Sequence, residues 1–109
     1  MSNVSEHELP SWSFLTNHAR VLISISHDPG IRLREIGEMV GITERAAHRI
    51  VGELADAGYI SRERNGRRNR YTVQSHLPLP DPFARKQSIG DLLGVLGREN
   101  SSEDGDSKR

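Results

Sequence analysis

The chain has 109 residues, 34% of them hydrophobic, and contains no cysteine. This length fits one ordinary domain, and the lack of cysteine excludes a disulfide framework, a thiolate zinc site and a cysteine nucleophile. The formal net charge is zero, from 15 basic and 15 acidic residues, which by itself argues against a nucleic-acid partner because phosphate binding needs a positive surface.

The charges are unevenly distributed along the chain. Five arginines and a single acid, Glu63, fall between Tyr59 and Val73, whereas four acids and no base fall between Glu99 and Asp106. A basic segment and an acidic segment therefore cancel in the total while remaining separate.

The N-terminal residues 1–11 are polar, and we expect them to form a disordered leader. They lack the basic and apolar regions of a signal peptide, and no apolar run approaches the roughly 20 residues needed to span a bilayer. We therefore expect a cytoplasmic protein with no membrane contact.

A first helix is predicted over residues 13–26. Its apolar residues recur at steps of three and four, which places them on one helical face; they are Trp12, Leu15, Ala19, Leu22 and Ile23. The run Asp28-Pro29-Gly30 should end this helix, since proline cannot continue it. Trp12 is predicted to lie in the core.

Two further helices are predicted after a short β-capable stretch at 31–33. The second helix covers residues 34–40 and ends at Gly41. Thr43 can cap a third helix, because its hydroxyl can accept an unpaired N–H of the first turn. That helix should extend to about Ala57, with Gly58 as the residue that closes a Schellman ending.

A β-hairpin is predicted next, from β-prone runs at 59–64 and 70–73. Asn65 and Gly66 lie between these runs, and an Asn-Gly pair in this position is a strong hairpin signal. We expect Tyr71 to be a core residue.

The C-terminal part is predicted to be less regular. Residues 77–82 contain three prolines and should form a stiff, extended linker, followed by a short amphipathic helix with Ser88 and Asp91 spaced as a capping box. Three glycines weaken this helix unless it packs on something. We divide the chain into the leader, a domain at 12–76, the linker and short helix at 77–97, and a disordered tail at 98–109.

The spacing of small and apolar residues between 36 and 50 is typical of a helix-turn-helix motif. Gly37 allows two helices to approach closely, Gly41 supplies the turn, and Ile42 fills the corner. Ala47 and Ile50 seat the third helix, which leaves its opposite face exposed, with Thr43, Glu44, Arg45, His48 and Arg49.

Residues 33–60, LREIGEMVGITERAAHRIVGELADAGYI, followed by residues 62–71, RERNGRRNRY, resemble the winged helix-turn-helix domain of bacterial transcriptional regulators of the MarR-like class. The resemblance covers about residues 13–75. It implies a fold that is mainly α with a small β-sheet, in the order helix, short strand, helix, helix, β-hairpin wing, and a C-terminal helix follows here.

The resemblance also implies sequence-specific binding of double-stranded DNA. The recognition helix, residues 44–57, would enter the major groove, and the wing, residues 62–70, would lie on the backbone or in the minor groove. Thr43 would then contact phosphate, Arg45 a base edge, and His48 and Arg49 bases or phosphates. The wing would contribute Arg62, Arg64, Arg67, Arg68 and Arg70, with Arg67 and Arg68 at its tip.

Some of these residues have alternative interpretations. Glu44 suits the helix dipole, although it can instead accept from a cytosine amino group. Arg49 is equally suited to pairing with Glu53 four residues on, and the wing arginines can form an ordinary solvated face.

No enzyme, cofactor or metal is expected. The sequence offers no nucleophile with a base and no phosphate-binding glycine loop, and its five histidines have no spacing typical of a metal site. We expect a homodimer formed through the first helix and residues 83–97. The alternative function is a winged-helix protein-protein interaction module without direct DNA readout.

Overall fold

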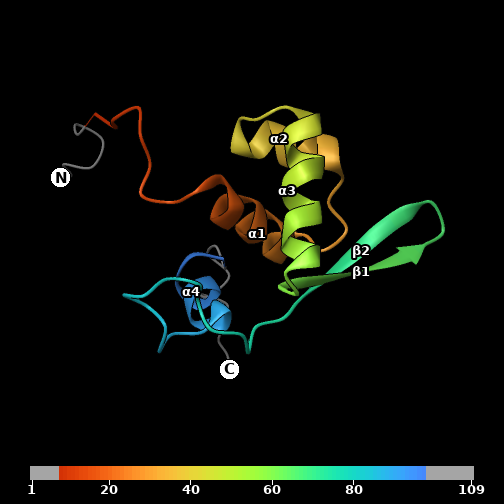
Figure 1. The fold of residues 1–109 in the computed structure, drawn as a ribbon. Helices are drawn as coiled ribbons and strands as arrows, with labels where there is room; N and C mark the ends of the chain where they lie inside the picture. The colour runs from red at the N-terminus through yellow and green to blue at the C-terminus, as the bar shows by residue number, and fades with distance from the viewer. Residues whose placement is uncertain (1–7, 98–109) are drawn as a thin grey trace, which may run out of the picture.

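The computed structural model describes residues 8–97 (Figure 1). In this range the order of elements is α1 (Asn17–His27), α2 (Leu33–Val40), α3 (Glu44–Asp56), β1 (Ile60–Asn65), β2 (Arg68–Val73) and α4 (Ile89–Leu96). The predicted class, mainly α with a β-hairpin and a C-terminal helix, is confirmed. The predicted tail and most of the predicted leader lie outside the described residues. No helix in the described range is long and apolar enough to cross a membrane.

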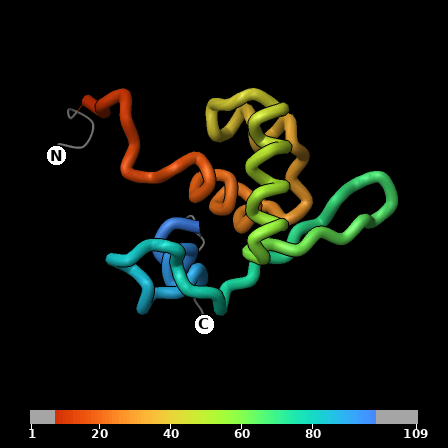
Figure 2. Tube along the Cα trace, in the orientation of Figure 1, coloured from red at the N-terminus to blue at the C-terminus, as the bar shows by residue number. Residues whose placement is uncertain are grey.

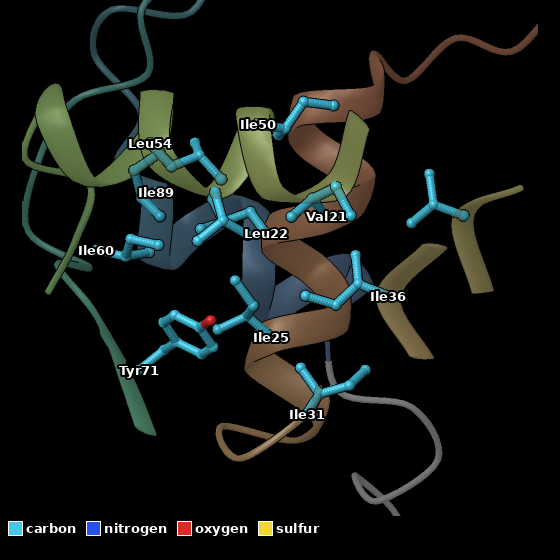
Figure 3. Close-up of a cluster of buried hydrophobic side chains, with 13 residues drawn as sticks. Val21, Leu22, Ile25, Ile31, Ile36, Ile50, Leu54, Ile60, Tyr71 and Ile89 are labelled. Carbon is cyan, nitrogen blue, oxygen red and sulfur yellow. The ribbon is translucent and has the colours of Figure 1, made fainter. Parts of the chain in front are cut away.

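One hydrophobic core joins the three N-terminal helices to the base of the hairpin (Figure 3). The α1 side chains Val21 and Ile25 are completely buried, as are Ile36 of α2 and Val51 of α3. Figure 3 shows the Tyr71 ring beside Ile25, and only 4% of Tyr71 is exposed, as predicted for a core residue. This core holds α3 and the hairpin in a fixed relation.

The start of the first helix differs from the prediction. The helix begins at Asn17, where the Thr16 hydroxyl accepts the Ala19 N–H at 3.1 Å. Trp12 therefore precedes the helix and cannot follow its periodicity; it is 60% exposed and its ring packs edge-on against Phe14. The prediction that Trp12 is a core residue is wrong.

The expected short strand at 31–33 is also absent from the structure. Arg32 is the extended N-cap of α2, and Leu33 is already helical. Ile31 still enters the core. Within residues 8–97, however, the backbone contact of this turn with the hairpin is a single hydrogen bond, from the Tyr71 N–H to the Pro29 carbonyl at 2.9 Å. One bond joins the turn to β2 without forming a ladder.

The turn between α2 and α3 has the predicted chemistry. Gly41 has a φ of 84°, and the Thr43 hydroxyl accepts the Ala46 N–H at 3.0 Å. A Cβ on Gly37 would lie 2.7 Å from the Ile42 carbonyl oxygen, so only glycine permits this approach of the two helices.

The end of α3 is a Schellman motif, as predicted. The Tyr59 N–H donates to the Leu54 carbonyl at 2.9 Å, and the Gly58 N–H donates to the Ala55 carbonyl at 3.0 Å. This ending turns the chain directly into β1.

The hairpin is tighter than predicted. Ile60 pairs with Val73 and Asn65 pairs with Arg68, which leaves Gly66 and Arg67 as the turn. Beyond Ile60 every β1 side chain is exposed, so the hairpin projects into solvent as a wing. Figure 2 shows it extending away from the helices, on the side opposite to α4.

The proline-rich segment folds back and pairs with the residues that lead into α4. The Leu79 N–H donates to the Gln87 carbonyl at 2.9 Å, and the Ile89 N–H donates to the Leu77 carbonyl at 2.8 Å. α4 begins with the predicted capping box, in which Ser88 and Asp91 exchange two hydrogen bonds. Ile89 enters the core, so α4 has a packing partner within its own chain.

Candidate nucleic-acid interface

The outer face of α3 carries the polar residues predicted to meet DNA. Ala47 and Ile50 are buried on the inner face. The residues of the opposite face are all exposed, namely Thr43, Glu44, Arg45, His48 and Arg49. The structure thus places the predicted recognition residues on one accessible helix surface.

Arg49 is engaged in a small polar network. Its guanidinium lies 3.2 Å from a Glu53 carboxylate oxygen, and His18 of α1 lies 2.6 Å from the other oxygen. The hydrogen bond with His18 and the neighbouring Arg49 lower the pKa of the Glu53 carboxyl, against the opposing effect of desolvation. The pairing of Arg49 with Glu53, one of the two alternatives for this residue, is therefore present.

The wing arginines do not share one face. Alternate residues of a strand point to opposite sides, so Arg62 and Arg64 lie on one face, and Arg68 and Arg70 lie on the other. Glu63 is the cross-strand partner of Arg70. One strand of DNA backbone lying on a face of the wing would therefore meet only part of the predicted set.

The wing is fixed to the turn that precedes α2. The Arg68 Nη2 donates to the Gly30 carbonyl at 2.6 Å, close to the bond between the Tyr71 N–H and the Pro29 carbonyl. These two contacts connect β2 to residues that are about 40 positions earlier in the chain. The wing base is consequently tied to the helix-turn-helix.

Two arginines outside the predicted set lie beside these residues. Arg32 and Arg34 line a hollow of about 380 Å³ together with Glu44, Arg67 and Arg68. A signal for them existed in the sequence, because two cations at the start of a helix oppose its dipole and are unusual there. Neither arginine was among the predicted DNA contacts.

The described residues hold no group of three or more His, Asp or Glu side chains close enough to bind a metal ion. The chemistry of this surface is that of guanidinium, imidazole and hydroxyl groups, which donate hydrogen bonds to phosphates and base edges.

Three helices followed by a two-stranded wing define a winged helix-turn-helix domain. A sequence model described as the MarR family matches residues 13–70, more than half of the chain. The chain belongs to the MarR family, whose members are DNA-binding regulators of transcription. It is also 36% identical over 63 residues to an uncharacterized protein, MJ1254, of Methanocaldococcus jannaschii. That match covers 57% of this chain and 13% of MJ1254.

Proposed function

We propose that this chain binds a specific sequence of double-stranded DNA, with α3 in the major groove and wing residues 62–70 on the backbone or in the adjacent minor groove. The observation that carries the proposal is the division of α3 into a buried face and an exposed polar face beside a projecting basic wing. A regulator of this kind acts where the chromosome lies, so a cytoplasmic location is part of the proposal.

Arg45 is the residue we assign to base recognition. It is exposed and, among the described residues, it forms no salt bridge. A guanidinium can bind guanine through two hydrogen bonds, which contributes roughly 1 to 3 kcal/mol of discrimination against another base. His48, one helical turn on, is assigned to the neighbouring base or phosphate.

Selection of bound duplexes from a random pool tests this function. We expect a defined sequence for the natural chain and, for Arg45→Ala, loss of preference at one base-pair position with binding retained. Lys108→Ala removes the same charge outside α3, the wing and the segments proposed below to form a dimer, and should leave the selected sequence unchanged. A pool that shows no enrichment would contradict DNA recognition and favour the alternative, a protein-interaction module on the same scaffold.

We also propose that two copies associate through α1 and residues 83–97. Exposed apolar side chains gather in and next to these segments: Phe14, which precedes α1, is 91% exposed, Phe83 99% and Val95 79%. A largely apolar hollow of about 440 Å³ lies between α1 and residues 79–92. Exposed apolar surface of this kind marks association sites.

Sedimentation analysis tests the association. A dimer should become a monomer on changing Val95 to Glu, and the selected DNA should contain two half-sites about 10 base pairs apart. A natural chain that sediments as a monomer at high concentration, or a selected sequence without symmetry, would contradict the dimer and leave single-site DNA binding intact.

A further inference from the structure

The hollow between α2, the start of α3 and the wing has a distinct charge. Four arginines line it, Arg32 and Arg34 from the start of α2 and Arg67 and Arg68 from the wing. Among the residues that the structure describes, Glu44 is the only acid on its wall. Four guanidinium groups and one carboxylate make this a strongly positive concavity.

The arginines of the hollow have few partners of opposite charge. All four are exposed, and within residues 8–97 none of them forms a salt bridge with a carboxylate. Arg34 lies in the first turn of α2, where the helix dipole opposes a cation. The guanidinium groups repel one another while the hollow is empty, and a bound anion offsets this repulsion through charge-assisted hydrogen bonds.

The hollow is already formed in the free chain. Arg68 is hydrogen-bonded to the Gly30 carbonyl and Tyr71 to the Pro29 carbonyl, which holds the wing wall against the α2 wall. The Glu35 carboxylate accepts the Arg32 N–H at 2.9 Å and fixes the start of α2. A preorganised site needs little ordering when its ligand binds.

We propose that this hollow binds one phosphodiester group of the DNA backbone, with Arg32, Arg34 and Arg67 as the binding residues. Arg68 acts as a positioning residue, because one of its N–H groups is already committed to Gly30. Glu44 repels the phosphate from the α3 side and leaves the arginine side for it. The proposal rests on the proposed function, since it requires α3 and the wing to meet the same duplex.

The phosphate at this position would fix the register of α3 relative to the backbone. A guanidinium presents a rigid fork of N–H donors to phosphate oxygens. Contacts of this kind orient a protein on the duplex without carrying sequence information. Removal of the site should therefore weaken binding to all sequences by a similar factor.

A scan of methylphosphonate substitutions tests the proposal. Each phosphate of the selected duplex is replaced in turn by a neutral methylphosphonate, and affinity is measured for the full chain and for its Arg34→Gln and Arg32→Gln variants. For the natural chain we expect one position that costs on the order of tenfold in affinity. In the Arg34→Gln variant that penalty should disappear, while the penalties at other positions remain.

Lys108→Gln is the control, since it removes one positive charge outside the hollow, α3, the wing and the two segments proposed to form the dimer. It should retain every penalty of the natural chain, and urea unfolding confirms that all variants fold. If every penalty persists in both the Arg34→Gln and Arg32→Gln variants, the hollow holds no backbone phosphate and the proposal is overturned. If the natural chain binds no DNA at all, that result contradicts the proposed function itself rather than the phosphate site alone.

Inorganic phosphate distinguishes a DNA phosphate from a free anion in the same hollow. Under the proposal, phosphate ion competes with DNA for the natural chain more effectively than chloride does at equal ionic strength. This excess competition should vanish in Arg34→Gln. Phosphate ion that binds at the Arg34 side chain without displacing DNA would show a separate anion site and overturn the proposal.

Discussion

Gly37 lies where the backbones of α2 and the turn to α3 come closest. A Cβ at this residue would stand 2.7 Å from the Ile42 carbonyl oxygen, a backbone atom that cannot move without displacing α3. Gly52, in the middle of α3, has nothing within 4 Å of its Cβ position. Two helical glycines of the same domain thus have opposite consequences.

Gly37→Ala should destabilise the fold by about 1 to 3 kcal/mol, as overpacking of a close contact does. Gly52→Ala should stabilise it by roughly 0.5 to 1 kcal/mol, because alanine loses less backbone freedom in a helix. Urea unfolding measures both. Equal effects of the two substitutions would contradict the close approach at Gly37.

Glu53 gives a second prediction at the level of one residue. Its pKa is lowered in the folded chain, first by the hydrogen bond with His18 and then by Arg49. A lowered pKa means that the ionised carboxylate contributes stability above its unfolded-state pKa, and that this contribution is lost as pH falls through the folded-state value.

Glu53→Gln should therefore be less stable than the natural chain at neutral pH, and the difference should shrink as pH falls below 4.5, the ordinary pKa of the carboxyl. The effect is small because the side chain is 48% exposed. Unfolding curves across this pH range measure it, with Glu38→Gln on α2 as a control. A difference that does not change with pH would exclude the ion-pair explanation.

Among the elements, α4 shows how a weak helix is held. It has only eight residues, and Gly90 and Gly94 lie within it. Gly97 ends the helix against α1, where a Cβ would lie 2.6 Å from the Ser26 hydroxyl oxygen and 2.9 Å from the Leu93 carbonyl oxygen. The docking contact with α1 supplies the stability that helix propensity does not.

Gly97→Ala should loosen α4 from α1, whereas Gly94→Ala, which meets nothing within 4 Å, should stabilise the helix by up to about 1 kcal/mol. Amide hydrogen exchange in residues 89–96 measures the local stability. Faster exchange in Gly97→Ala and slower exchange in Gly94→Ala are expected. Slower exchange in both would contradict the docking role of Gly97.

The elements also show what a sequence can predict. The cap at Thr43, the Schellman ending at Gly58 and the capping box at Ser88 were predictable because each depends on neighbouring residues. The absence of a strand at 31–33 could not be predicted, because a β-prone run becomes a strand only where another strand lies beside it and forms hydrogen bonds with it. The antiparallel contact of residues 77–79 with 87–89 depends on the fold in the same way.

The candidate site shows the same limit. The exposure of Arg45 and His48 could be predicted from helical periodicity, because apolar residues identify the inner face of α3. The hollow that brings Arg32 and Arg34 to Arg67 was not predictable, since these residues are separated by more than 30 positions and are brought together by contacts of β2 with residues 29–30. The division of the wing arginines between two faces required the strand register.

At the scale of the whole molecule, the net charge is zero but the charges are unevenly distributed over the surface. Basic residues of the wing and of the α2 start lie on one side of α3, and α4 lies on the other (Figure 1). Under the proposed function, a surface of this kind would attract DNA in one orientation, even though the chain carries no overall charge. Affinity should therefore depend on which cations are removed rather than on how many.

The proposed function requires that α3 and the wing bind the same DNA. The salt dependence of DNA affinity, measured for two double variants, tests most directly whether the wing takes part. Arg67→Ala with Arg68→Ala should weaken every DNA sequence alike, and the slope of log affinity against log salt should flatten by about 0.9 for each phosphate that the variant no longer binds. Lys108→Ala with Arg109→Ala removes the same charge outside all of the proposed interfaces and should leave affinity and slope nearly unchanged. Equal slopes for the wing variant and the natural chain would contradict DNA binding by the wing.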